Sequence, residues 1–186
     1  MEFRPNEKVA KSATLVRRII ENQEKPRLPK SEQDRIDNDN AVKMITLVAC
    51  LNYAMVDLGS DLEDAGLMKQ NIKRNYNIAY RKVVDIHRAF DTMVSKVNKL
   101  AGKRYMYLMD KNDQAIHEHI YLQGVERSYN VVMALCRLIN IYYNKIRGRY
   151  LYRPLVGIDY VMNMLNFPDI PKHDLDFIID KAVSIE

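Results

Sequence analysis

The chain has 186 residues, of which 47% are hydrophobic and 28% are charged, which is the balance of a soluble globular protein. A chain of this length can bury a core that is stable without disulfides or metals. Six glycines and six prolines are too few for a β-sandwich or barrel with many turns, and they exclude collagen-like and low-complexity classes.

The formal net charge is +5, but the charge is spread unevenly along the chain. Residues 65–112 carry 11 basic and 3 acidic side chains, and residues 113–154 carry 6 basic and 3 acidic ones. Residues 41–64 and 155–186 are acidic. A concentrated basic region favours a polyanionic partner such as a nucleic acid. The alternative is a solvated helical surface whose charge is offset by the two acidic segments.

The two cysteines, Cys50 and Cys136, lie among apolar residues, which predicts buried, reduced thiols in a cytosol-like compartment. The first eleven residues lack the apolar region of a secretory signal. Polar residues interrupt the longest apolar stretch, 42–58, so a membrane span is not expected. The sequence therefore predicts a cytoplasmic protein.

The N-terminal part of the chain is predicted to be an arm. Residues 7–23 have the spacing of an amphipathic helix. One face of this helix is a candidate partner-binding stripe of Val9, Ala13, Val16 and Ile20. Residues 24–39 are polar, contain two prolines and are predicted to be a linker. We therefore divide the chain into an arm, residues 1–40, and a helical bundle domain, residues 41–186.

The next predicted helix, residues 41–58, is apolar nearly all round and should lie at the centre of the fold. Gly59 is expected to end it, because glycine is common just after helix C-termini. An acidic loop over 59–64 follows. The helix predicted at 113–147, which is described below, must also be covered by other helices. The helix predicted at 41–58 is the obvious candidate to cover it.

Two long segments, 65–101 and 113–147, carry apolar residues at alternating spacings of three and four, which is a heptad pattern. With a modest connector at 102–112, they are predicted to form a long antiparallel hairpin. Short helices are expected at 155–166 and 172–184. The predicted fold is all-α, an antiparallel bundle built around this hairpin, with the N-terminal arm and short C-terminal helices.

The hairpin register predicts which side chains meet. Residue i should face a residue near 213 − i, so His87 faces Glu126, and His119 lies one heptad away. Such convergence would allow a one-metal site at His87, His119 and Glu126. The alternative is an exposed His–Glu ion pair worth about 0.5 kcal/mol. The chain has no Glu-x-x-His pair of the di-iron type, and we expect no cofactor.

Basic and aromatic residues are interleaved at the end of the helix predicted at 113–147. In the predicted hairpin this end lies beside the start of the helix predicted at 65–101. Cations there would neutralise phosphates, and tyrosines would stack on exposed bases. The candidate nucleic-acid or polyanion-binding residues are Lys69, Lys73, Arg74, Lys145, Arg147, Arg149, Tyr150, Tyr152 and Arg153. The alternative is cations that complement helix C-termini.

Catalytic motifs are absent from the sequence: there is no Gly-x-Ser-x-Gly, no phosphate-binding loop and no Gly-x-Gly-x-x-Gly. Our leading hypothesis is a non-enzymatic, oligomeric structural protein whose arm and terminal helices join neighbouring subunits and whose basic hairpin meets a polyanion. By analogy of architecture alone, tailed-phage virion connectors are proteins of this kind, which would place the chain in a virion. The alternatives are a sequence-independent nucleic-acid-binding or packaging factor, and a small helical enzyme or metal-binding protein.

Overall fold

The structure is a computed structural model that describes residues 30–101, 103–146 and 157–184. These residues form α-helices without a strand, so the predicted all-α bundle is confirmed. The helices are α2 (Lys30–Asp64), α3 (Gln70–Ala101), α4 (Lys103–His119), α5 (Gly124–Lys145), α6 (Ile158–Met164) and α7 (Leu175–Val183). The predicted helix at 7–23 lies outside the described residues.

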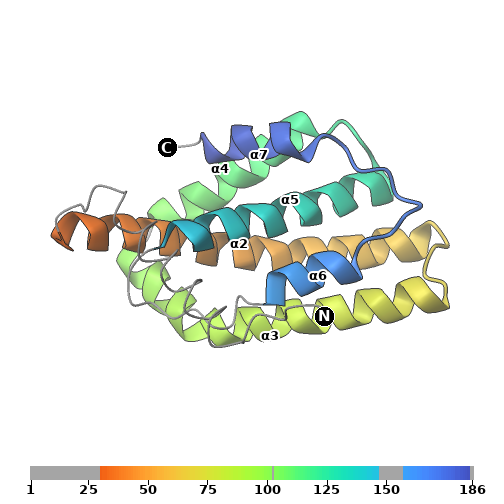
Figure 1. Cartoon of the computed structure of the whole chain (residues 1–186), viewed down its shortest axis with the longest axis horizontal. Helices are drawn as coiled ribbons and strands as arrows, with labels where there is room; N and C mark the ends of the chain where they lie inside the picture. Colours follow the sequence, from red (N-terminus) through yellow and green to blue (C-terminus); the bar gives the residue numbers. More distant parts are fainter. Residues whose placement is uncertain (1–29, 102, 147–156, 185–186) are drawn as a thin grey trace, which may run out of the picture.

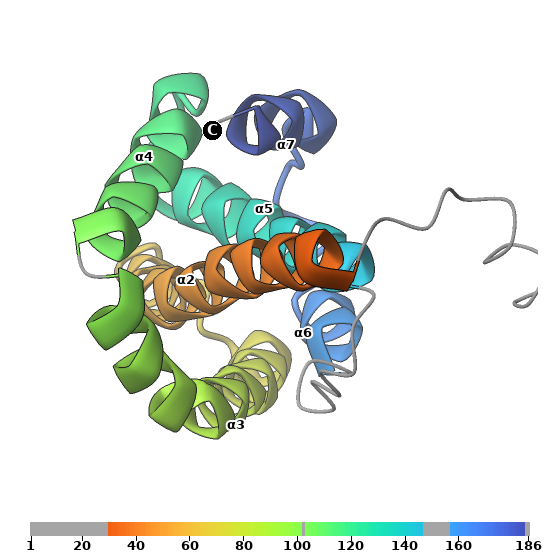
Figure 2. The same ribbon diagram turned by 90° about the vertical axis from the view of Figure 1, so that its left-hand side faces the viewer.

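Helix α2 occupies the centre of the bundle, as its apolar sequence predicts (Figure 1, Figure 2). It packs most extensively on α5, then on α3, and also on α4. Its fully buried side chains include Met44, Leu47, Leu51, Met55 and Leu58. Burial of several large side chains on one helix makes α2 the main contributor to the core.

The predicted pairing of 65–101 with 113–147 is wrong. Helices α3 and α5 lie on opposite sides of α2 and both run antiparallel to it (Figure 1, Figure 2). The long hairpin of this fold is instead formed by α2 and α3. Heptad residues such as Val83 and Tyr129 are buried, but their helices α3 and α5 pack on α2 rather than on each other. Heptad spacing identifies the inward face without identifying the partner, and α2 has the larger apolar surface to bury.

The segment predicted as one helix, 113–147, is two helices. The expected connector at 102–112 is largely helical and belongs to α4, which ends at His119. The chain is non-helical over 120–123 before α5 begins. Gly124, at the start of α5, has φ +60°, a left-handed conformation that glycine adopts without the strain of a side chain.

Helix α2 is longer than predicted at both ends. Its first turns include part of the expected linker, where the side chain of Gln33 donates a 2.7 Å hydrogen bond to Asp37 one turn later. Gly59 does not end the helix, and residues 59–64 are helical. The glycine that does end it is Gly66, at φ +67°. Its N–H donates to the Glu63 carbonyl, and the N–H of Leu67 donates to the Leu62 carbonyl. These two hydrogen bonds form a Schellman motif.

The short C-terminal helices are confirmed. Helix α6 packs on α3 and α5, and α7 packs on α4 and α5. The loop before α7 is held by Asn130 of α5, which is fully buried. Its amide donates to the Pro171 carbonyl at 3.3 Å, and its Oδ1 accepts the backbone N–H of His173 at 3.0 Å.

By length and composition alone, α2 could cross a membrane. However, 61% of the apolar part of this helix is buried inside the bundle. Its apolar character is therefore explained by its central position in the fold.

Candidate functional site

The structure divides the predicted polyanion-binding residues between two ends of the bundle. Lys69, Lys73 and Arg74 are exposed where α3 begins, just after the end of α2. Lys145 is exposed at the end of α5. Arg147, Arg149, Tyr150, Tyr152 and Arg153 lie outside the described residues, as do Val9, Ala13, Val16 and Ile20 of the arm.

Lys145 can be placed along α2 through a shared aromatic ring. Its Nζ lies 5.0 Å from the ring centre of Tyr142, and Nζ of Lys43 on α2 lies 5.5 Å from the same centre. Lys43 is 21 residues before Asp64, which at 1.5 Å per residue is about 32 Å along the helix. The single patch expected from the hairpin is therefore not formed. The reason is that α3 and α5 run in the same direction, so the end of one does not meet the start of the other.

The candidate metal ligands do not converge either. His87 is on α3 and Glu126 is on α5, and these helices are separated by α2 (Figure 2). The His119 ring packs edge-on against Phe177 of α7, with ring centres 5.3 Å apart. Among the residues that the structure describes, no group of three His, Cys, Asp or Glu side chains could hold a metal ion. The predicted contact between His87 and Glu126 is wrong, because it depended on the incorrect pairing of the two hairpin helices.

A pocket of about 540 Å³ lies between α2, α4 and α5. Its wall is partly apolar, with Cys50, Ala54, Ile116, Val131 and Leu135. Carboxylates dominate its polar part, with Asp57 and Asp61 from α2 and Asp110 and Asp113 from α4. Arg127 from α5 is the one arginine or lysine in this lining. A pocket of this composition favours a cationic or amphipathic occupant over an anionic one.

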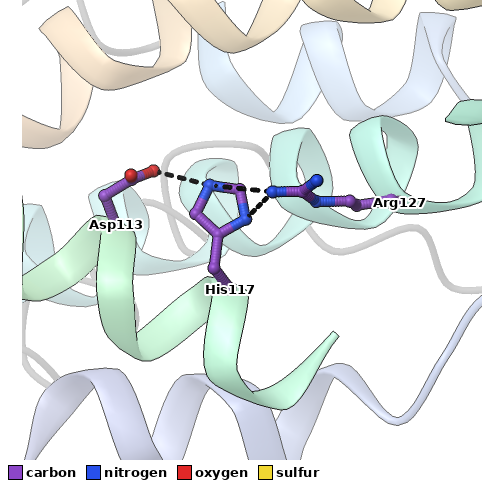
Figure 3. A network of polar contacts seen from close by, with 3 residues as sticks. All are labelled: Asp113, His117 and Arg127. Carbon is purple, nitrogen blue, oxygen red and sulfur yellow. Dashed lines mark hydrogen bonds and ion pairs between the residues drawn. The ribbon is translucent and has the colours of Figure 1, made fainter. Parts of the chain in front are cut away.

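Three residues of the pocket lining, Asp113, His117 and Arg127, form one polar network (Figure 3). The Nε2 atom of His117 lies 2.9 Å from Oδ1 of Asp113, one turn earlier on α4. Arg127 donates from α5 to Nδ1 of the same imidazole. The imidazole therefore lies between the carboxylate of Asp113 and the guanidinium of Arg127. Because both ring nitrogens are engaged, His117 has no free nitrogen to act as a base on a substrate.

The sequence contained part of this network. Asp113 and His117 have the i, i+4 spacing of neighbours on a helix face. Arg127 was missed because it belongs to the next helix. The break at 120–123 redirects the chain, and heptad spacing through the break does not reveal that turn.

Neither cysteine thiol in the described residues is poised as a nucleophile. Burial, with a smaller contribution from Asp113, raises the pKa of Cys50 in the pocket wall to about 12. Burial, with a smaller contribution from Asp159, raises the pKa of Cys136 to about 12. The thiolate is the reactive form, so both side chains are protonated and inert near neutral pH.

A second hollow, of about 330 Å³, lies between α2 and α3. It is lined by Val56, Gly59, Ser60, Glu63, Met68, Lys73, Tyr76, Asn77 and Tyr80. Ser60 of α2 lines both this hollow and the larger pocket. We call the two together the α2 groove, with Tyr53, Val56 and Ser60 as its floor.

The floor of the α2 groove is the uncovered side of the central helix. Tyr53 is 68% exposed and Val56 is 51% exposed, whereas Leu51, Met55 and Leu58 are fully buried. Tyr53, Val56 and Ser60 follow one another at spacings of three and four, so they share one face of α2. In the part of the chain that the structure describes, this face is exposed at all three positions.

Comparison of the chain with models of protein families, with curated proteins and with solved structures found no match in any of the three. The function is therefore inferred from the residues themselves.

Proposed function

We propose that this chain is a non-enzymatic, helical assembly protein that joins neighbouring subunits through the α2 groove. The observation that carries the proposal is the uncovered apolar floor on a helix that is otherwise the core of the fold. An exposed aromatic side chain beside an exposed aliphatic one, with charged residues around them, is typical of a protein interface. A groove between helices takes an amphipathic helix through apolar anchors spaced three and four residues apart.

The chemistry of the groove supports binding rather than catalysis. The imidazole of His117 is engaged at both nitrogens, and the thiol of Cys50 is held in its protonated form. The carboxylates of Asp57, Asp61, Asp110 and Asp113 line the same pocket. These groups suit recognition of a positively charged surface.

The test is the mass of the protein in solution. Sedimentation velocity over a range of concentrations should show species heavier than the 21.8 kDa monomer. Replacing Tyr53 and Val56 together by glutamate should shift the population to monomer, because two charges would be desolvated in the interface. Tyr121→Glu is the matched control, since Tyr121 is 88% exposed and lies outside the groove. A wild-type protein that stays monomeric at every concentration would refute the proposal.

Polyanion contact is a second candidate function, and one observation favours it. The cations of Lys43 and Lys145 share the ring of Tyr142 at the end of α5, where the basic segment 147–153 continues the chain. If this end binds nucleic acid, affinity should fall steeply with added salt. Lys43→Glu with Lys145→Glu should weaken binding of a labelled oligonucleotide. Lys69→Glu with Lys73→Glu, at the other end of the bundle, is the control.

A further inference from the structure

We infer that the occupant of the α2 groove is the N-terminal segment 7–23 of a second copy of this chain. This inference rests on the proposed assembly function and names the partner of the same site. Three properties of the segment match the groove: its apolar stripe, its length and its charge.

The apolar stripe and the groove have the same length. From Val9 to Ile20 the predicted helix advances 11 residues, or about 16 Å at 1.5 Å per residue. On α2, the span from Tyr53 to Glu63 is 10 residues, or about 15 Å. The stripe is therefore long enough to lie along the groove, and its apolar side chains can cover Tyr53 and Val56.

The charges are complementary. The groove lining carries five carboxylates, of Asp57, Asp61, Glu63, Asp110 and Asp113, against the cations of Lys73 and Arg127. The segment 7–23 carries four basic side chains and two acidic ones. Arg17 is four residues after Ala13 and three before Ile20, so in the predicted helix it flanks the stripe. It would meet the carboxylates beside the floor while the stripe covers Tyr53 and Val56.

The reach of the chain favours a second copy over the chain's own arm. If residues 23–30 were extended as a polyproline helix, at ~3.1 Å per residue, they would span about 22 Å. Residues 20–23, if helical as the sequence predicts, would add about 5 Å, so Ile20 could reach about 26 Å along α2 from Lys30. Tyr53 lies about 34 Å along α2 from Lys30, at 1.5 Å per residue. Even with its linker straight, the chain's own arm covers part of the groove, whereas the arm of a second copy can cover all of it.

A cross-link between two different copies tests the occupant. One copy carries Ala13→Cys, at the middle of the stripe, and a second, tagged copy carries Ser60→Cys, on the groove floor. On mixing under mild oxidation, we expect a disulfide-linked heterodimer on a non-reducing gel. The matched control replaces Ser60→Cys by Tyr121→Cys, which is exposed outside the groove and should form little or no heterodimer.

Charge reversal supplies the second measurement. Arg17→Glu should raise the dissociation constant of the assembly about tenfold or more, because a charge facing carboxylates changes sign. Combining it with Asp57→Lys and Asp61→Lys should recover part of that loss. Arg18→Glu is the control. Arg18 directly follows Arg17, so in the predicted helix its side chain lies about 100° further from the apolar stripe. Equal effects of Arg17→Glu and Arg18→Glu would count against docking through this face.

The outcomes separate this inference from the proposed function. If the chain assembles and groove variants dissociate it, but no heterodimer cross-link forms, the groove takes another partner and the inference is wrong while the function stands. A cross-link formed only within a chain carrying both cysteines would show that the arm docks on its own bundle, which also overturns the inference. A protein that never assembles overturns both.

Discussion

Gly59 allows an aromatic side chain of α3 to approach the backbone of α2. The Tyr76 hydroxyl donates a buried 2.6 Å hydrogen bond to the Met55 carbonyl, one turn before Gly59. A Cβ placed on Gly59 would lie 2.7 Å from Cζ of Tyr76 and nearer still to its hydroxyl. Both distances are shorter than carbon and oxygen atoms tolerate, so Gly59→Ala must displace the ring.

The expected cost can be worked out from this contact. In a helix interior, exchanging glycine for alanine is worth about 1 kcal/mol in favour of alanine. Against this stand the hydrogen bond to Met55, about 1 kcal/mol, and the strain of overpacking, about 1–3 kcal/mol. Gly59→Ala should therefore destabilise the protein by about 1–3 kcal/mol, the reverse of its effect on an exposed helix.

Urea denaturation followed by circular dichroism measures this change. Ser60→Ala, at the next position on the exposed side, is the control and should change the free energy of unfolding by less than about 0.5 kcal/mol. In a Tyr76→Leu background, which removes the ring, the cost of Gly59→Ala should largely disappear. A Gly59→Ala protein as stable as the wild type would refute the close approach of Tyr76 to α2.

Three further predictions concern stability. Asn130→Ala should cost about 2 kcal/mol and increase proteolysis near α7, because two hydrogen bonds to the preceding loop are lost; normal stability and protease resistance would contradict this. Gly66→Ala should cost about 1 kcal/mol in urea denaturation and Gly66→Asn less, since asparagine tolerates the left-handed φ better; equal costs would argue against a strained cap. Burial raises the pKa of Cys136 from 9.0 to about 12, so the folded state favours the thiol. Its contribution to stability is complete below pH 9 and is lost as the pH rises towards 12, so Cys136→Ala should flatten the decline of the urea midpoint over this range.

Local patterns predicted much of this fold. Heptad spacing placed Val83 and Tyr129 on inward faces, and both are buried. The all-round apolar character of α2 placed it at the centre. These properties depend on residues close together in sequence, so a sequence pattern is enough to reveal them.

The arrangement in space was harder to predict. A heptad stripe does not say which helix it will meet, and this led to the wrong pairing of α3 with α5. Gly59 and Gly66 look alike in sequence, but only Gly66 has the left-handed backbone of a helix cap. The α2 groove depends on where α3 and α4 stop covering α2, and no local pattern encodes that limit.

The central position of α2 has a consequence for how the chain folds during synthesis. Its most extensive partner, α5, ends 81 residues after α2 does. At about 5–20 residues per second, a ribosome needs about 4–16 s to make that stretch. Throughout this interval the apolar face of α2 that packs on α5 has no partner. We therefore expect chaperones to bind the nascent chain. A truncated product that ends before Gly124 should aggregate rather than remain soluble.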